Sequence, residues 1–263
     1  MIHICLSFEF RFQIQSLICV GSLASSLLTF SIVFSQVEKT KIKGVTLNKP
    51  NEIDTTQVRI NSTFLLLGTL NDYISYNYGN IKNKFDLYYK NEKPLKNFVD
   101  SIAKKDFNVN LIEEKNYLVS EKLSNLMNSF YIENNLNDSL FNSDEKKLSF
   151  LLGVYYRNGE KINDNIYKIQ LANSSKHKNV YEYLKELNCQ NILFKRLDNI
   201  PRIYQIYFQP TDIMKKYFAT IETEKSKLSA SKDEFSRTNE KLKEELKKQK
   251  DIENSKIIEI FSN

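Results

Sequence analysis

The sequence predicts an α+β fold, with an antiparallel sheet in the order β-β-α-β-β over residues 148–208, packed helices and a long C-terminal helix. Three observations predict it. Two strand-like runs flank Asn158-Gly159, and this dipeptide favours a hairpin turn because both residues tolerate a positive φ. Apolar residues recur at helical spacing over 180–187, before two further strand-like runs. No glycine or proline interrupts residues 211–263.

The first packed element is expected just after residue 56. Val58, Ile60, Ser62 and Phe64 alternate with polar neighbours and lead into Leu65-Leu66-Leu67. A short apolar run of this kind fits a strand that enters the sheet and a buried helix equally well, so both alternatives stay open.

The segment after Pro94 is predicted to be an amphipathic helix with proline in its first turn. Its apolar stripe, at i, i+3, i+4 and i+7, consists of Leu95, Phe98, Val99 and Ile102. Residues 107–112 then predict a short strand and 118–130 a second helix. Residues 134–139 are rich in Asn, Asp and Ser, which predicts a loop.

Four runs predict the sheet. Residues 148–157 are rich in apolar and aromatic side chains and predict its first strand, while alternation over Ile162–Leu171 predicts the second. A helix at 180–187 leads to strands at 191–196 and 202–208. We expect the helix to pack on one face of this sheet.

A long, charged helix is predicted over residues 211–263. Apolar residues recur in it every seven positions, at Met214, Ile221, Leu228, Phe235 and Leu242. The companion positions of the heptad are polar, so only a modest helix–helix contact is expected, with a protein partner or a second copy. The apolar tip at 257–261 either folds back onto the core or docks on a partner.

The amino terminus predicts export. Residues 17–34 carry no charge and are mostly apolar, Arg11 precedes them, and Ser35 offers a small residue for cleavage. We therefore expect a signal peptide over 1–35, with an uncleaved membrane anchor as the alternative. A linker over 36–55 and an α+β domain over 56–210 follow. The expected location is periplasmic, cell-envelope or secreted.

Composition limits the possible partners and cofactors. The chain has a formal charge of +6, but its cations are interspersed with acids and few are arginine, which argues against a nucleic-acid partner. Beyond residue 35 the only cysteine is Cys189 and the only histidine is His177. Neither an intramolecular disulfide nor a Cys/His zinc site can be built there, and we expect no metal and no cofactor.

Three groups of residues are candidates for a site, although no catalytic residue is assigned. Ser174, Ser175 and His177 lie between a predicted strand and helix, where they could hold an anion, pair as nucleophile and base, or simply cap the helix. Cys189 fits a small buried hydrophobe better than a nucleophile. The tyrosines could stack on sugars or pack in the core: Tyr73, Tyr76, Tyr78, Tyr88, Tyr89, Tyr155, Tyr156, Tyr204 and Tyr207.

These observations favour a non-enzymatic exported protein, structural or partner-binding, that associates through its C-terminal helix. One alternative is an envelope or extracellular hydrolase that uses carboxylates or the Ser174/His177 region. The other is a binder of glycans or small ligands through its tyrosine faces. A membrane would be a partner only if the amino-terminal segment stayed uncleaved.

Overall fold

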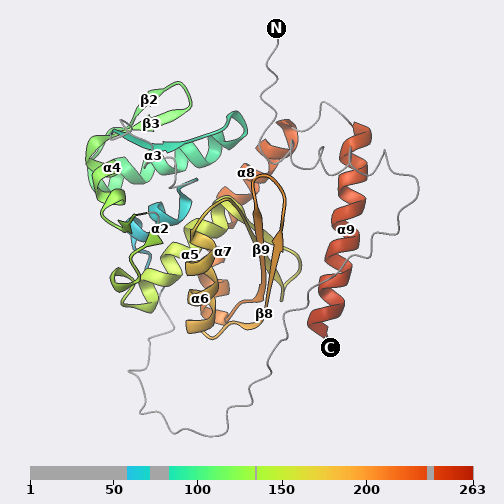
Figure 1. Ribbon diagram of the computed structural model, residues 1–263. Helices are drawn as coiled ribbons and strands as arrows, with labels where there is room; N and C mark the ends of the chain where they lie inside the picture. Colours follow the sequence, from blue (N-terminus) through green and yellow to red (C-terminus); the bar gives the residue numbers. More distant parts are fainter. Residues whose placement is uncertain (1–57, 72–82, 134, 236–239, 263) are drawn as a thin grey trace, which may run out of the picture. The chain divides into compact units, whose positions relative to one another are not determined.

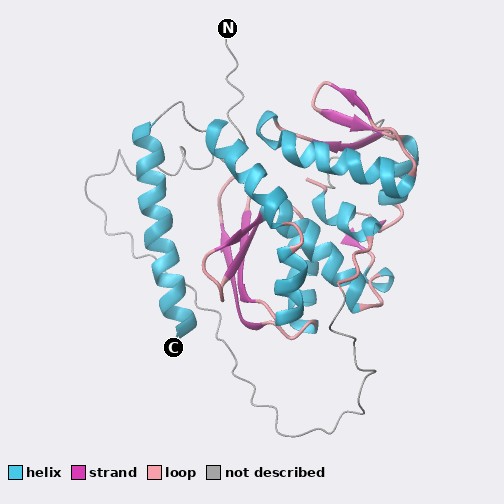
Figure 2. Cartoon of the chain, turned by 180° about the vertical axis from the view of Figure 1, so that it is seen from behind, coloured by secondary structure: helices cyan, strands magenta, loops and turns pink. Residues whose placement is uncertain are grey.

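The computed structural model describes residues 58–71, 83–133, 135–235 and 240–262 (Figure 1). The predicted signal peptide and linker lie outside the described residues, as do Tyr73, Tyr76 and Tyr78. No helix among the described residues is long and apolar enough to cross a membrane. Helices and antiparallel sheets together confirm the predicted α+β class (Figure 2).

Two helices packed against each other form the centre of the fold, α2 (Ser62–Thr69) and α5 (Asp144–Asn158). Each begins at a capping side chain. The Asn61 carboxamide oxygen accepts hydrogen bonds from the first turn of α2, and the Ser143 hydroxyl accepts one from the first turn of α5. Every residue of α2 from Phe64 onward is buried.

The two helices approach closely because a glycine of each lies at their crossing. A Cβ built on Gly68 would lie 2.8 Å from the amide nitrogen of Val154, and one built on Gly153 would lie 3.0 Å from the Cα of Gly68. Only glycine lets two backbones come this near without a clash.

The strand predicted at 148–157 is wrong, because these residues form the buried part of α5. All ten of them are buried, so the helix has no polar face and no amphipathic stripe that its sequence could reveal. The signal that distinguishes it from a strand lies upstream, where Ser143 is followed by the acidic residues Asp144 and Glu145, as at a helix start. At 58–67, the helix is the correct alternative.

A small three-stranded antiparallel sheet and several short helices pack beside this pair. The sheet order is β1-β3-β2, and β4 and β5 form a separate two-stranded ladder. The elements are β1 (Lys84–Leu87), the 3₁₀ helix η2 (Lys90–Glu92), α3 (Lys93–Phe107), β2 (Ile112–Glu114), β3 (Tyr117–Val119), α4 (Glu121–Asn128), β4 (Tyr131–Ile132), β5 (Asn135–Leu136) and the 3₁₀ helix η3 (Asp138–Leu140). Both helices predicted in this region are confirmed; the strand expected at 107–112 begins at Ile112, and β5 and η3 occupy most of the predicted loop.

The main sheet has four antiparallel strands in the order β6-β7-β9-β8. They are β6 (Gly159–Lys161), β7 (Tyr167–Ala172), β8 (Gln190–Leu197) and β9 (Ile203–Gln209), with α6 (Lys176–Glu186) between β7 and β8. The predicted order β-β-α-β-β is therefore confirmed, although its first strand begins at Gly159 and does not cover residues 148–157.

Helices cover one face of the main sheet. Tyr155 of α5 stacks on Phe218 with ring centroids 4.2 Å apart, and both rings contact Tyr167 of β7. Phe218 belongs to α7 (Asp212–Ala219), so α5 and α7 share an aromatic layer on this face. Figure 1 shows α6 on the same side.

The single C-terminal helix predicted over 211–263 is wrong, because three helices occupy this region: α7, α8 (Glu222–Phe235) and α9 (Glu240–Ser262). The first break lies at Thr220 and Ile221, where Ile221 is buried against the core. The heptad positions Met214 and Leu228 are buried there too, so they serve the core and not a coiled coil.

Candidate functional site

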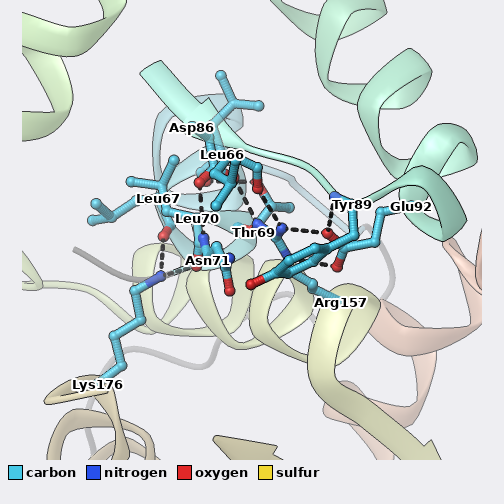
Figure 3. A network of polar contacts seen from close by, with 11 residues as sticks. Leu66, Leu67, Thr69, Leu70, Asn71, Asp86, Tyr89, Glu92, Arg157 and Lys176 are labelled. Carbon is cyan, nitrogen blue, oxygen red and sulfur yellow. Dashed lines mark hydrogen bonds and ion pairs between the residues drawn. The ribbon is translucent and has the colours of Figure 1, made fainter. Parts of the chain in front are cut away.

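Two ion pairs that share one arginine are buried where α2 and α5 end (Figure 3). Arg157 of α5 lies with its guanidinium 2.6 Å from the carboxylates of Asp86 and Glu92. The three side chains are 1%, 1% and 6% exposed. We call Asp86, Glu92 and Arg157 the buried ionic network.

All five N–H donors of Arg157 are used. Nε and Nη2 donate to Glu92, Nη1 donates to Asp86, and the other two donors bond the carbonyl oxygens of Thr69 and Leu87 at 2.9 and 2.8 Å. A buried charge with every hydrogen bond satisfied holds its neighbours in one arrangement and has no donor left for a ligand. The network is a structural clamp between α2, α5, β1 and η2.

Electrostatics agree with this role. Burial alone would raise the pKa of Glu92, but the charge and hydrogen bonds of Arg157 outweigh burial and hold that pKa below its ordinary value of 4.5. Burial raises the pKa of Tyr88, whose ring lies 5.1 Å from the guanidinium carbon of Arg157. Glu92 is therefore ionised at neutral pH and paired.

Lysine side chains donate hydrogen bonds to carbonyl oxygens at the C-terminal ends of the same two helices. Lys176 donates to the carbonyl oxygens of Leu67 and Leu70 at the end of α2, at 3.0 and 2.6 Å (Figure 3). Lys225 and Lys232 of α8 donate to two carbonyls at the end of α5, those of Tyr156 and Arg157. Cations at helix C-termini satisfy the free carbonyls and the helix dipole.

The structure does not assemble Ser174 and His177 into a catalytic pair. His177 Nδ1 lies 2.6 Å from the carbonyl oxygen of Ser174 and so donates to the backbone, not to the hydroxyl. The imidazole stacks on Tyr204 at 3.6 Å, and burial lowers its pKa, so it is neutral at pH 7. The hydroxyl of Ser174 accepts from the Lys176 amide, and Ser175 is the N-cap residue of α6.

The other candidates have packing roles. The Sγ of Cys189 lies 3.7 Å from the Sδ of Met214, and burial raises the pKa of the thiol to about 11. A thiol with such a pKa is a poor nucleophile at neutral pH. Among the candidate tyrosines that the structure describes, Tyr89 and Tyr204 are half-buried. The others are buried: Tyr88, Tyr155, Tyr156 and Tyr207. The glycan-binding interpretation therefore has no exposed aromatic platform among these residues.

A group that the sequence did not reveal lies on the sheet face opposite α5, α6 and α7. We call it the outer face. The strand register places two rows of side chains across this face, and each strand contributes at most one side chain to a row. The first row is Glu160, Lys168, Tyr207 and Leu193; the second is Gln170, Gln205 and Lys195.

The second row is polar throughout, and its two glutamines bond each other. Gln205 Nε2 donates to Gln170 Oε1 at 2.9 Å. Lys195 stands beside them, and Lys168 lies in the neighbouring row. Amide and ammonium groups side by side give this face both hydrogen-bond donors and acceptors and a positive charge.

The hairpin that joins β8 to β9 adds further cations at the edge of the sheet. Arg196 and Arg202 are each about half exposed, and both lie near one carboxylate, Asp198, at 3.1 and 3.8 Å. Two guanidinium groups thus share a single acid, which leaves a positive hairpin tip.

These cations escape sequence inspection because they are distant along the chain. Lys168 belongs to β7 and Lys195 to β8, and only the pairing of both strands with β9 places the two cations on one face. The usable sequence signal is alternation: positions 168, 170, 205 and 207 are polar or amphipathic between core residues.

No group of three or more His, Cys, Asp or Glu side chains that could hold a metal ion occurs within the described part of the chain. No protein-family model matches the chain. Comparison with curated proteins finds no match either.

Solved structures do match. Mesophilic variants of the homing endonuclease I-DmoI share 16% identity over 62% of this chain and 95% of theirs, with a TM-score of 0.41. I-DmoI in complex with DNA and Mn shares 16% identity over 63% of this chain and 96% of its own, with a TM-score of 0.39. I-DmoI in complex with DNA and Ca has a TM-score of 0.36 at 16% identity, over 59% and 85%.

Four sequence-based predictions are corrected here: an exported non-enzymatic protein, its periplasmic, envelope or secreted location, the absence of a nucleic-acid partner, and the C-terminal helix as a site for protein association. The similar solved structures are of a homing endonuclease, in several cases in complex with DNA. The hydrolase and glycan-binding alternatives find no better support.

Proposed function

We propose that the protein binds double-stranded DNA through the outer face of its main sheet. The observation that carries the proposal is the row Gln170, Gln205 and Lys195, with Lys168 beside it, on the face that α5, α6 and α7 leave uncovered.

The residue types match what base edges require. Glutamine can form two hydrogen bonds with the N6 and N7 edge of adenine, and lysine can donate to O6 and N7 of guanine. Gln170 and Gln205 lie on adjacent strands, which are about 4.8 Å apart, so both can face neighbouring base pairs.

The dimensions also suit duplex DNA. β8 and β9 form a two-stranded ribbon of eight and seven residues, about 25 Å long at 3.3 Å per residue. The major groove, about 12 Å wide, admits such a ribbon. The ribbon would then follow about seven base pairs at 3.4 Å each.

The hairpin tip supplies the second kind of contact that DNA binding needs. Arg196 and Arg202 lie at the end of the ribbon, where phosphates flank an occupied groove. Arginine binds phosphate through two parallel hydrogen bonds and fixes the position of the protein without reading the sequence.

The experiment measures binding of a fluorescent duplex of about 30 base pairs by anisotropy, with the full-length protein over a range of salt concentrations. For Arg196→Gln/Arg202→Gln we expect an increase in Kd of about tenfold and a decrease of about 2 in the slope of log K against log salt, since each arginine releases about one counterion.

The matched control is Lys104→Gln/Lys227→Gln. These lysines are 54% and 58% exposed, each pairs with one carboxylate, and they lie on α3 and α8. The control removes the same charge and should leave Kd within about twofold of the parent, as expected for residues outside the interface. Equal losses in the two double variants would refute the proposal.

A further inference from the structure

Helix α9 occupies the outer face. Glu253 Oε1 lies 2.8 Å from Lys195 Nζ, and its other carboxylate oxygen lies 3.7 Å from Lys168 Nζ. Glu253 also shares a hydrogen bond with the hydroxyl of Tyr207. Figure 1 shows α9 beside β8 and β9, on the side away from α5 and α6. A carboxylate therefore stands among the groups that we assign to DNA.

Two further contacts seat the helix. Lys250 Nζ lies 2.7 Å from Glu160 Oε1, at the other edge of the sheet. Ile257 is 5% exposed and forms, with Ile166 and Tyr207, a small cluster separate from the main core. Together these contacts leave Lys168 and Gln205 only 7% and 4% exposed.

The chemistry of this buried surface is unusual for a permanent contact. A sheet covered by helices on both faces is apolar on both, because polar side chains lose hydrogen bonds to water when they are buried. Here the covered face keeps Lys168, Gln170 and Gln205. Such residues are expected on a face that is exposed in one state of the protein.

The contact between α9 and the outer face also leaves a polar atom unsatisfied. The carboxamide oxygen of Asn254, on α9, is buried and accepts no hydrogen bond from any described residue. A buried polar atom without a partner opposes the contact that buries it. Lys195 and Lys250 are 44% and 52% exposed, so water weakens their ion pairs with α9.

From these observations we propose that α9 is an intramolecular competitor of DNA: it covers the outer face in the free protein and leaves when a duplex binds. The inference rests on the proposed function and adds its regulation. Only the fraction of molecules with α9 displaced can bind, so the apparent Kd equals the Kd of the open form divided by that fraction.

The test uses two substitutions on one turn of α9. Ile257→Asp places a charge in the apolar cluster and should displace the helix, whereas Ile258→Asp introduces the same charge at a residue that is 38% exposed. We expect Ile257→Asp to lower the Kd for the duplex about tenfold and Ile258→Asp to change it less than about twofold. Circular dichroism and thermal melting serve as controls that test whether both variants are folded.

A second pair of substitutions changes the structure less, in case Ile257→Asp perturbs more than the contact between α9 and the sheet. Glu253→Gln removes the carboxylate that meets Lys168 and Lys195, and Asp251→Asn removes a charge from an exposed position of the same helix. Both raise the net charge by one, so a general electrostatic gain is equal in the two. A lower Kd for Glu253→Gln than for Asp251→Asn supports the inference, and equal values contradict it.

The position of α9 is followed directly with a tryptophan. The chain contains none, so Phe261→Trp, at a partly buried position of the apolar cluster, gives a single reporter. Its emission should shift to longer wavelength on saturation with duplex, and without duplex when combined with Ile257→Asp. Saturable DNA binding without a shift would overturn the inference and leave the proposed function intact. If neither the parent nor Ile257→Asp binds duplex, the proposed function fails and the inference with it.

Discussion

At the scale of single residues, Arg157 links four elements of the fold through its hydrogen bonds. It is 2% exposed as a residue and connects α5 to Asp86 of β1, Glu92 of η2 and the end of α2. Removing one partner from a buried ion pair leaves the other charges without compensation, and this costs far more than losing an exposed pair. The role of Arg157 can therefore be tested through stability.

We predict that Arg157→Met lowers the free energy of unfolding by about 3–5 kcal/mol, because Asp86 and Glu92 stay buried without a counter-charge. Arg157→Lys should lose less, since it keeps the charge but not the five donors. Urea unfolding followed by circular dichroism gives the values. Arg202→Met, at a half-exposed arginine, is the control and should cost less than about 0.5 kcal/mol. A loss as small for Arg157→Met as for the control would show that the network adds no stability.

The lowered pKa of Glu92 predicts how stability depends on pH. Its folded pKa lies below the ordinary 4.5, so the paired carboxylate stabilises the fold above pH 4.5, and this stabilisation is lost as the pH falls through the folded value. Glu92→Gln removes the titration. The difference in unfolding free energy between parent and variant should be constant from pH 7 to 5 and shrink below pH 4.5. A difference that stays constant down to pH 3 would contradict the assignment.

At the scale of elements, the crossing of α2 and α5 sets the centre of the fold. Its two glycines leave no space for a methyl group: a Cβ on Gly153 would clash with the carbonyl oxygen of Leu65, and one on Gly68 with that of Phe150. Backbone atoms cannot rotate away as a flexible side chain could. The spacing of the two helices is therefore fixed by these glycines.

Gly153→Ala should lower the free energy of unfolding by about 1–3 kcal/mol, because its methyl group would overpack the helix crossing. This cost outweighs the better helix propensity of alanine. Ser229→Ala, at an exposed position inside α8, introduces the same residue without a clash and should be neutral or slightly stabilising. Thermal melting of the two variants compares them. Equal melting temperatures would mean that the helices can move apart without cost.

Elements with one apolar face were predictable from the sequence, and elements without one were not. The helices at Lys93–Phe107 and Lys176–Glu186 bury a stripe and expose the rest, so the 3.6-residue spacing of their apolar side chains predicts them close to their true positions. By contrast, residues 148–157 of α5 are buried on all sides, so their apolar run predicts a strand where the structure has a helix. The break at Thr220 depends on Ile221 packing into the core, a tertiary effect with no local signal.

At the scale of the whole molecule, the candidate site was not predictable because its parts are distant in sequence. Lys195 and Glu253 are 58 residues apart, and Lys168 joins them from a third segment. Composition gave a net charge of +6 but not its location. Only the sheet register reveals that cations and amides share one face, and only the placement of α9 reveals that this face is covered. The residues proposed from sequence, Ser174 and His177, lie on a helix terminus instead.

The central helix pair also has a consequence during synthesis. Arg157 and Thr69, which meet at the ends of α5 and α2, are 88 residues apart. At roughly 5–20 residues per second, a ribosome completes α5 about 4–18 s after α2. Throughout that interval Leu65, Leu66 and Leu67, all buried in the finished protein, lack the helix α5 against which α2 packs. The nascent polypeptide therefore exposes an apolar segment, residues 65–67, until α5 emerges from the ribosome and covers it.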